Sequence, residues 1–355
     1  MKTLTHKRMY RALVNKDSSY EGIFFAAVKT TNIFCRPTCP ARRPKPEHVE
    51  FFQSAKEALL HGYRPCKVCK PLEAVGAMPA FIQKLLEEIT KHPSKRIGDA
   101  ELARQRIEPN KVRRWFKANV GVTFAAYQRM SRMKHAYEQL SNGQSVTQTA
   151  FDSGYDSLSG FADAFRNLVG DAPSNAHTAK IIVLRRITTP LGPMIAGATD
   201  DGICLLEFAD RRMLRTELKA LQRHFRASVL FGNNAHVDSL ERQLREYFDG
   251  ERKRFDLTLV TPGTGFQQLV WRKLQDIPYG ETKSYKRQAE AIGKPEAVRA
   301  VANANGCNRI AIVIPCHRVI GEDGKLHGYG GGVWRKKWLL EMERKSFDNM
   351  LAISY

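Results

Sequence analysis

Cys316 and His317 are the residues of this sequence whose types and spacing most directly indicate chemistry. They follow the apolar run Ile310–Pro315, which predicts a buried and rigid support. A cysteine attacks as a thiolate, and apolar surroundings oppose the ionisation of a thiol. We therefore expect Cys316 to be a nucleophile whose proton is removed with the help of a neighbouring group.

Four further cysteines form two close pairs: Cys35, Cys39, Cys66 and Cys69. Each pair can supply two corners of a tetrahedron, and four thiolates satisfy Zn²⁺ without an open coordination position. An iron–sulfur cluster and disulfides are the alternatives. All four cysteines lie in one short segment that is poor in core residues, so the sequence predicts a single zinc ion there.

The overall charge indicates a polyanionic partner. The chain has 355 residues, enough for two or three domains, and 57 Lys and Arg against 36 Asp and Glu give a net charge of +21. The basic excess occurs along the whole chain rather than in one tail, which favours double-stranded DNA over a protein that is merely basic.

The expected compartment is the cytosol. The first residues contain no apolar core of signal-peptide length, and no run approaches the ~18 apolar residues of a membrane span. An odd number of cysteines in such a chain favours reduced thiols. Cys204 and Cys307 belong to no motif and are expected to be ordinary core or surface thiols.

Composition divides the chain into segments that we expect to be domains or subdomains. The first is irregular and rich in Pro and Cys, the second helical, the third a mixture of strands and helix, and the fourth a series of short helices and glycine turns. Their ranges are 1–78, 79–180, 181–260 and 261–355. Linkers are predicted near 71–78 and 172–180.

The helical segment contains a short internal repeat. Residues 115–121 and 164–170 have similar sequences, and each closes a predicted helix–turn–helix unit. Apolar residues at helical spacing give each unit an inner stripe: Val112, Trp115 and Phe116 in the first, Leu158, Phe161, Ala162 and Phe165 in the second. Two such units would place two helices in successive major grooves of DNA, whereas hairpins that only stabilise the fold are the alternative.

Residues 79–180 resemble the DNA-binding domain of AraC-type transcription activators. The basic helix of the first unit supplies the side chains that we expect on DNA: Arg113, Arg114 and Lys117. The resemblance implies an all-α domain with tandem helix–turn–helix units and a role in transcription. RNA polymerase is then an expected partner.

Residues 34–39 and 62–71, which carry the clustered cysteines, resemble the N-terminal domain of the Ada family of bacterial adaptive-response proteins. The resemblance covers most of residues 10–75 and implies that Cys35 accepts a methyl group from a methylphosphotriester of DNA. It also implies that the expected cytosol is bacterial. Zinc would keep the sulfur nucleophilic. Methylation would change the charge of a four-thiolate zinc site from −2 to −1 and thereby tighten DNA binding.

The motif Pro315–Val319 resembles the acceptor motif of O6-alkylguanine-DNA alkyltransferases, and the resemblance extends over roughly residues 262–345. It implies that Glu343 orients His317, which takes the proton of Cys316 through a water molecule. Glu341 is the nearby alternative carboxylate. Asn308 matches a hinge asparagine between the DNA-binding helices and the active site.

The target base must leave the stacked duplex before Cys316 can reach it. Residues 284–293 and 295–305 predict another helix–turn–helix, with Ser284 as N-cap and an inner stripe of Val298, Val301 and Ala302. The resemblance implies that Arg299 fills the space of the flipped base and that Tyr285 helps to rotate the phosphate. Gly330 stands where relatives often carry a side chain, so the range of alkyl groups stays open.

The sequence therefore predicts a multidomain α+β protein. Its parts are a small zinc-bound α/β domain, an all-α AraC-type domain and an alkyltransferase domain, the last with an RNase H-like α/β subdomain and a helical, winged-helix-like subdomain. The expected activity is single-use methyl transfer from O6-methylguanine and O4-methylthymine to Cys316 and from phosphotriesters to Cys35. Two alternatives stay open: a repair enzyme without regulation, and a zinc- or redox-responsive regulator with an inert C-terminal domain.

Overall fold

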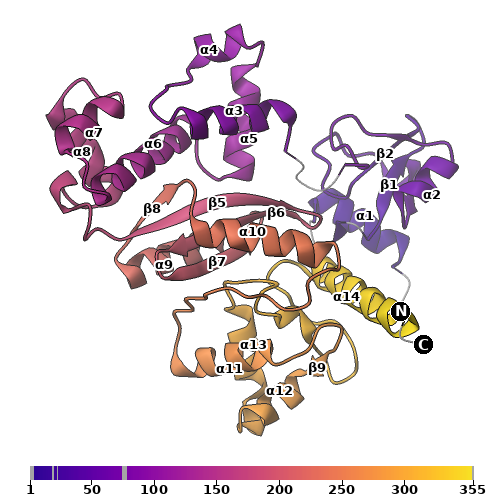
Figure 1. Ribbon diagram of the computed structural model, residues 1–355. Helices are drawn as coiled ribbons and strands as arrows, with labels where there is room; N and C mark the ends of the chain where they lie inside the picture. Colours follow the sequence, from indigo (N-terminus) through magenta and orange to yellow (C-terminus); the bar gives the residue numbers. More distant parts are fainter. Residues whose placement is uncertain (1–3, 18–19, 22, 74–77, 354–355) are drawn as a thin grey trace.

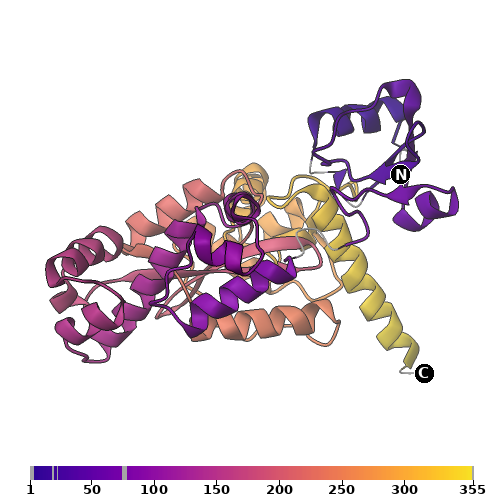
Figure 2. The same ribbon diagram turned by 90° about the horizontal axis from the view of Figure 1, so that it is seen from above.

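The computed structural model describes residues 4–17, 20–21, 23–73 and 78–353, with side chains up to residue 344. Its elements form three groups along the chain: a small mixed sheet with two helices, a helical group, and a larger α+β group (Figure 1). In both views the first group lies on the opposite side of the molecule from α7 and α8 (Figures 1 and 2).

The first group is built on a sheet with strand order β3-β1-β2-β4. β1 pairs antiparallel with β2 and β3, and β2 pairs parallel with β4. Successive strand residues face opposite sides, so Ala26 packs with Leu13 of α1 and Ala27 with Ala58 of α2. The elements are α1 (His6–Asn15), β1 (Phe25–Val28), β2 (Ile33–Cys35), η2 (Pro46–His48), β3 (Val49–Phe52), α2 (Ala55–Leu60) and β4 (Arg64–Pro65).

The second group consists of helices whose starts are set by side-chain caps. Thr123, Ser145 and Ser157 each accept a hydrogen bond from a first-turn amide of α6, α7 and α8. Gly170 ends α8 at a φ of +89°, a conformation that favours glycine. The helices are α3 (Ala80–Lys91), α4 (Asp99–Arg104), α5 (Pro109–Asn119), α6 (Phe124–Ser141), α7 (Val146–Asp152) and α8 (Leu158–Val169), followed by η3 (Pro173–Asn175).

The expected inner stripes of the helix–turn–helix units are largely present. Val112 and Phe116 of α5 are buried, as are Phe161 and Phe165 of α8. Leu158 is 43% exposed, so its assignment to the inner stripe was wrong. It is the first residue of α8 and lies outside the cluster that the following turns form.

The third group begins with a sheet of strand order β7-β6-β5-β8. β5, β6 and β7 form an antiparallel meander, and β8 returns parallel to β5 after α9. β6 was not expected from the sequence, because its segment is rich in Gly, Pro and Ala, residues that are depleted in strands. The elements are β5 (Ile181–Thr189), β6 (Gly192–Thr199), β7 (Gly202–Phe208), α9 (Leu214–Phe225), β8 (Ser228–Phe231) and α10 (Ala235–Phe248).

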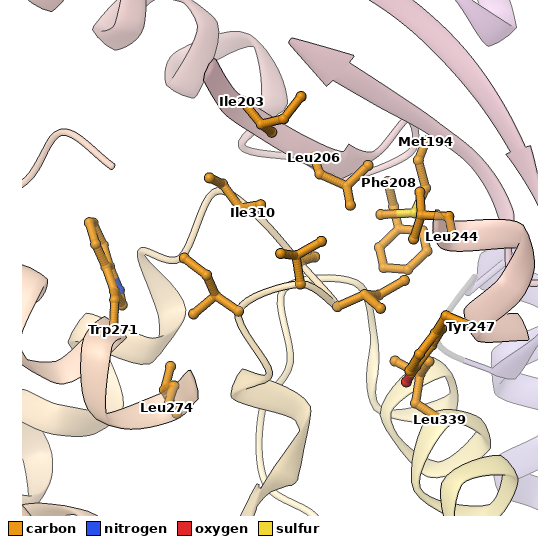
Figure 3. Close-up of a cluster of buried hydrophobic side chains, with 14 of the residues drawn as sticks. Met194, Ile203, Leu206, Phe208, Leu244, Tyr247, Trp271, Leu274, Ile310 and Leu339 are labelled. Atoms are coloured by element: carbon orange, nitrogen blue, oxygen red, sulfur yellow. The ribbon is translucent and has the colours of Figure 1, made fainter. Parts of the chain in front are cut away.

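One hydrophobic core joins this sheet to the C-terminal helices. Leu206 and Phe208 of β7 pack with Leu244 of α10, and the same cluster includes Trp271 and Ile310 (Figure 3). The remaining elements are α11 (Gly265–Gln275), β9 (Lys283–Ser284), α12 (Tyr285–Ala291), η4 (Pro295–Ala297), α13 (Val298–Gly306), η5 (Cys316–Arg318), β10 (Val319–Ile320) and α14 (Val333–Ile353).

The helix pair α12 and α13 follows the predicted ranges with one correction. Ser284 caps α12 by accepting a hydrogen bond from Arg287 N at 3.2 Å. The buried residues of α13 are Val301, Ala304 and Asn305. Ala302 instead lines a pocket, so its assignment to the inner stripe was wrong.

The segment expected as a second linker, 172–180, is packed in place. Ala176 is buried in a cluster with Phe161 and Phe165 of α8 and with Ile181 of β5. Tyr137 Oη also donates a hydrogen bond to Ala179 O at 2.9 Å. The helical group and the larger sheet therefore share a core. Part of the other expected linker, at 74–77, lies outside the described residues.

The expected multidomain α+β class is confirmed. Within the described part of the chain, no helix is both long enough and apolar enough to cross a membrane.

Candidate functional site

The four clustered cysteines lie at the ends of strands that the first sheet brings together. Cys35 is the last residue of β2, and Cys66 follows β4, whose pairing with β2 is extended by a hydrogen bond from Cys66 N to Phe34 O at 3.0 Å. The four Sγ atoms, which include those of Cys39 and Cys69, lie within 4.8 Å of one another. Parallel pairing of two short strands thus converts two distant sequence pairs into one cluster.

This cluster fits Zn²⁺ in both geometry and charge. Cys39 Sγ and Cys66 Sγ are 4.0 Å apart, close to the ~3.8 Å edge of a tetrahedron with Zn–S bonds of about 2.3 Å. Hydrogen bonding to Cys39 and Cys69, together with burial, raises the pKa of Cys35 well above its usual value. A cation bound at this position would balance the charge of four adjacent thiolates.

A buried ion pair fixes the loops around the cluster. The guanidinium of Arg36 is 3.5 Å from Glu21 and donates hydrogen bonds to Cys69 O at 3.2 Å and to Lys70 O at 3.3 Å. The amide of Arg36 also donates to Cys69 Sγ at 3.4 Å. Arg36 therefore links the loop after Cys35 to the loop around Cys69.

The second candidate site is a pocket that Cys316 helps to line. The pocket has a volume of about 480 Å³. Its lining includes Tyr285, Arg299, Ala302, Cys316, Tyr329 and Gly330. Burial raises the pKa of Cys316, whereas a hydrogen bond from Asn308 opposes that rise. The thiol therefore needs further help to ionise at neutral pH.

Asn308 holds the sulfur directly, which the expected hinge role did not include. Its Nδ2 donates to Cys316 Sγ at 3.1 Å and to Ile314 O at 2.9 Å. Its Oδ1 accepts from Ile310 N at 3.0 Å. The buried side chain of Asn308 thus links two backbone positions of the apolar run, Ile310 and Ile314, to the thiol of Cys316.

His317 is completely buried and contacts the carboxylate of Glu343. His317 Nε2 is 2.9 Å from Glu343 Oε1. If Nε2 carries the proton, Nδ1 is an acceptor, and it has no hydrogen-bond partner among the described groups. Burial lowers the pKa of His317, so the imidazole is neutral at physiological pH. Glu341, the alternative carboxylate, is exposed and lies 3.5 Å from Lys337 Nζ.

Glu343 is held by residues that sequence reasoning missed. Its carboxylate accepts hydrogen bonds from Tyr247 Oη at 2.6 Å, from Gly280 N at 3.1 Å, and from Arg318 Nη2 at 2.9 Å and Nε at 3.0 Å. Burial opposes ionisation, but His317 and Arg318 hold the pKa of Glu343 well below its usual value. Arg318 lies within the recognised motif Pro315–Val319, next to His317, whereas no local pattern marks Tyr247.

The predicted DNA-contacting residues are placed on two surfaces. Arg299 is exposed on α13 at the pocket, and Tyr285 lies half-buried at the start of α12 beside it. Arg113, Arg114 and Lys117 are exposed on α5, where Arg113 contacts Asp99 and Arg114 lies 3.7 Å from Glu108. The structure thus separates a group near Cys316 from a group on the helical domain.

The structure also places three residues for which the motifs predicted no role. Cys204 is buried in β7, where burial raises its pKa to about 12, and Cys307 is exposed. A Cβ on Gly330 would lie 2.8 Å from Arg211 Cζ, so a side chain there would require Arg211 to move.

Comparison with known proteins agrees with these sites. Residues 8–72 match the metal binding domain of Ada, residues 103–178 a helix-turn-helix domain, and residues 265–345 the 6-O-methylguanine DNA methyltransferase, DNA binding domain. Each match falls on a segment for which the sequence motifs predicted that resemblance, and the resemblances are confirmed.

Relatives extend the similarity to nearly the whole chain. The chain is 38% identical over 357 residues to the bifunctional transcriptional activator/DNA repair enzyme Ada of Escherichia coli, covering 97% of this chain and 98% of that protein. It is 36% identical over 340 residues to the regulatory protein Ada of Salmonella typhimurium, covering 92% and 94%. A crystal structure of Mycobacterium tuberculosis O6-methylguanine methyltransferase matches at 41% identity and a TM-score of 0.41, covering 47% of this chain and 94% of that one. The chain belongs to the Ada family.

Proposed function

We propose that this protein repairs alkylated DNA by irreversible methyl transfer to two of its own cysteines and that one transfer makes it a transcriptional activator. The observation that carries the proposal is the presence in one chain of two different thiol sites, a four-cysteine cluster at Cys35 and the Asn308–Cys316–His317–Glu343 arrangement. The bifunctional relative from Escherichia coli, similar over 97% of the chain, supports it.

At Cys316 the proposed step begins with loss of the thiol proton to neutral His317 through a bridging water. Glu343 accepts a hydrogen bond from His317 Nε2, and this leaves Nδ1 as the nitrogen that takes up the proton. The sulfur attacks the methyl carbon of O6-methylguanine or O4-methylthymine, an S–C bond forms and the C–O bond breaks. The electron pair of that bond passes to the base, which takes up one proton, equivalent to the proton that the thiol lost.

The thioether leaves Cys316 without a route back to a thiolate, so each molecule acts once. The base must be flipped into the 480 Å³ pocket. Arg299 on α13 would occupy the space left in the stack, and Tyr285 would act on the rotated phosphate. Both side chains lie at the pocket, which supports these roles.

At Cys35 the sulfur would attack the methyl carbon of a methylphosphotriester, and the C–O bond breaks to leave an ordinary phosphodiester. Zn²⁺ held by the four cysteines would keep the sulfur ionised at neutral pH. Loss of one negative charge at this site would then reduce repulsion from DNA phosphates. The buried Arg36–Glu21 pair would support this reaction by holding the loop after Cys35 against the loop around Cys69.

We further propose that residues 1–78, 79–180, 181–260 and 261–355 are the zinc acceptor domain, the AraC-type domain and the two alkyltransferase subdomains. Double-stranded DNA is the common partner, and Arg113, Arg114 and Lys117 would contact it from α5. RNA polymerase would be the partner of the methylated form. The proposed site of action is the bacterial cytosol, where DNA and reduced thiols coexist.

Peptide mass spectrometry tests the proposal after incubation of zinc-loaded protein with DNA that carries both lesions. We expect one methyl group on the Cys316 peptide and one on the Cys35 peptide. Methylation of Cys316 alone would favour a repair protein without the switch. Absence of methyl from both peptides would refute the enzymatic function.

Promoter binding tests the regulatory half separately. We expect protein methylated at Cys35 to bind a cognate promoter more tightly than unmethylated protein, with an advantage that shrinks as the salt concentration rises. Equal affinity of the two forms would show that methylation does not act as a switch.

A further inference from the structure

The backbone in front of Cys316 contains an uncommon turn centred on Ile312. Ile312 has a φ of +73°, and it is the β-branched member of the non-glycine residues with positive φ in the described chain. Val313 N donates to Ala311 O at 2.9 Å, a bond between residues i+2 and i. Positive φ with this bond defines a classic γ-turn, which is rare and strained in L-residues.

The surrounding fold holds this turn on both sides. Ala311 N donates to Leu206 O and Leu206 N donates to Arg309 O, both at 2.8 Å, so the residues before the turn are tied to β7. Figure 3 shows Ile310 beside Leu206 in the core. Ile312 is itself only 1% exposed. Strain of this kind persists only where the surroundings over-determine the conformation.

The turn decides where the next carbonyl lies. After it, Ile314 N donates back to Ile310 O at 3.0 Å, and a second, inverse γ-turn at Pro315 brings Cys316 N to 2.8 Å from Ile314 O. The same Ile314 O accepts a hydrogen bond from Asn308 Nδ2, which also donates to Cys316 Sγ. The direction of the asparagine amide therefore depends on the position of the Ile314 carbonyl, together with the hydrogen bond that Asn308 Oδ1 accepts from Ile310 N.

We infer that Ile312 is a positioning residue for the acceptor thiol: its strained γ-turn places Ile314 O, and Ile314 O aims the Asn308 amide at Cys316 Sγ. The inference deepens the proposed function of Cys316 and rests on it. Neither Ile312 nor its turn touches the substrate. Its effect on the reaction passes through Asn308, whose hydrogen bond favours the thiolate.

A matched pair of variants separates the backbone of Ile312 from its side chain. Ile312→Gly and Ile312→Ala both remove the packed side chain, but only glycine adopts φ of +73° without strain. We expect the alanine variant to unfold more readily, with an unfolding constant roughly 5–30-fold larger than that of the glycine variant. The probe is urea-dependent labelling of Cys204, which is buried in β7 and reports on this part of the protein.

Ile310 supplies the control, because it is equally buried and its φ is not positive. At an ordinary backbone position glycine is less stable than alanine, so the order at Ile310 should be the reverse of that at Ile312. If alanine is as stable as glycine at Ile312, or more stable, the turn is not strained and the inference is overturned.

The second measurement is the single-turnover rate of methyl transfer to Cys316 in the full, zinc-loaded chain. We expect Ile312→Ala to be slower by about tenfold or more near neutral pH, with its rate–pH profile displaced to higher pH, because the thiolate has lost a hydrogen bond. Ile312→Gly and Ile312→Val should stay near the wild-type rate and profile. Affinity for unmodified duplex should be the same in all three.

Equal rates and identical pH profiles for the alanine variant and the wild type would overturn the positioning role. If the wild type itself transfers no methyl group, the proposed function fails, and the inference is then decided by the stability pairs and by the pH profile of iodoacetamide labelling of Cys316. In that labelling, an unshifted profile for Ile312→Ala would count against it.

Discussion

Cys35 and Cys316 are two thiols of one chain with contrasting surroundings. Cys35 lies among three other sulfurs at the ends of paired strands, with no imidazole in the cluster. Cys316 lies in a pocket, receives a hydrogen bond from Asn308 and precedes a buried His317–Glu343 pair. Within the described residues, Cys316 belongs to no group of metal-binding side chains.

The difference shows two ways to make a thiolate in a site where burial opposes it. In the proposed mechanism, a bound cation would stabilise the charge of Cys35 directly, so its reactivity would depend on metal occupancy. Cys316 would depend on a proton acceptor whose orientation is fixed by a carboxylate, so its reactivity would depend on hydrogen-bond geometry and on pH. Treatments that damage one site should therefore leave the other intact.

Exchange of each sulfur for oxygen gives the largest expected effect. Cys316→Ser should abolish transfer from O6-methylguanine and leave transfer from phosphotriesters unchanged, and Cys35→Ser should do the reverse, because a hydroxyl is a far weaker nucleophile than a thiolate. Peptide mass spectrometry on each lesion separately makes the measurement. Loss of both activities in either variant would mean that the two sites are not independent.

Removal of zinc should be nearly as selective. A chelator that withdraws the ion should eliminate methylation of Cys35 and loosen the fold of residues 1–78, since the binding energy of such an ion contributes to folding. Methylation of Cys316 should proceed at an unchanged rate. Zinc content and the two peptide masses are measured on the same sample. Loss of Cys316 methylation in the same sample would contradict the view that the two thiols are activated independently.

Glu343→Gln should lower the transfer rate at Cys316 by roughly 10²–10⁴-fold, because the imidazole loses the partner that fixes its tautomer. Glu341→Gln, on the exposed face of α14, is the matched control and should have no effect. Glu343 is buried with several hydrogen bonds, so the thermal transition of the variant is recorded beside the rate. A folded variant with the wild-type rate would exclude the relay.

The methyl-transfer rates of Cys316 and Cys35 should also differ in their dependence on pH, although this effect is smaller than those of the substitutions. Burial raises the pKa of Cys316 and lowers that of His317, so lowering the pH protonates the thiol first and His317 only under more acidic conditions. The Cys316 rate should therefore rise with pH, by about tenfold per unit where thiol ionisation is limiting. The Cys35 rate should be nearly flat while zinc stays bound. A flat Cys316 profile would argue against a proton-limited thiol.

Much of the site followed from local sequence. The spacing of four cysteines predicts a metal cluster, and Cys316, His317 and Glu343 lie in short matching motifs. The helix–turn–helix stripes followed from periodicity, except at the first turn of α8 and at Ala302. Such assignments succeed because cysteine ligation and helix amphipathicity depend on spacing along the chain.

Other contacts depended on long-range packing. Tyr247 reaches Glu343 from α10 across 96 residues, and residues 172–180 pack on the helical group although their composition suggests a linker. The buried strand β6 is rich in Gly, Pro and Ala, so its composition does not reveal it. Local propensity gives little information on any of these, since each is decided by which surfaces meet in the folded chain.

By itself the sequence determined which side chains the proposed reactions use: two cysteines, a histidine and a carboxylate of fixed type and spacing. Only the tertiary structure decided how they are held. Ile312 illustrates the reason, because no sequence preference favours a β-branched residue at positive φ. Its conformation exists where β7, Asn308 and the surrounding core together outweigh the strain of the backbone in front of Cys316.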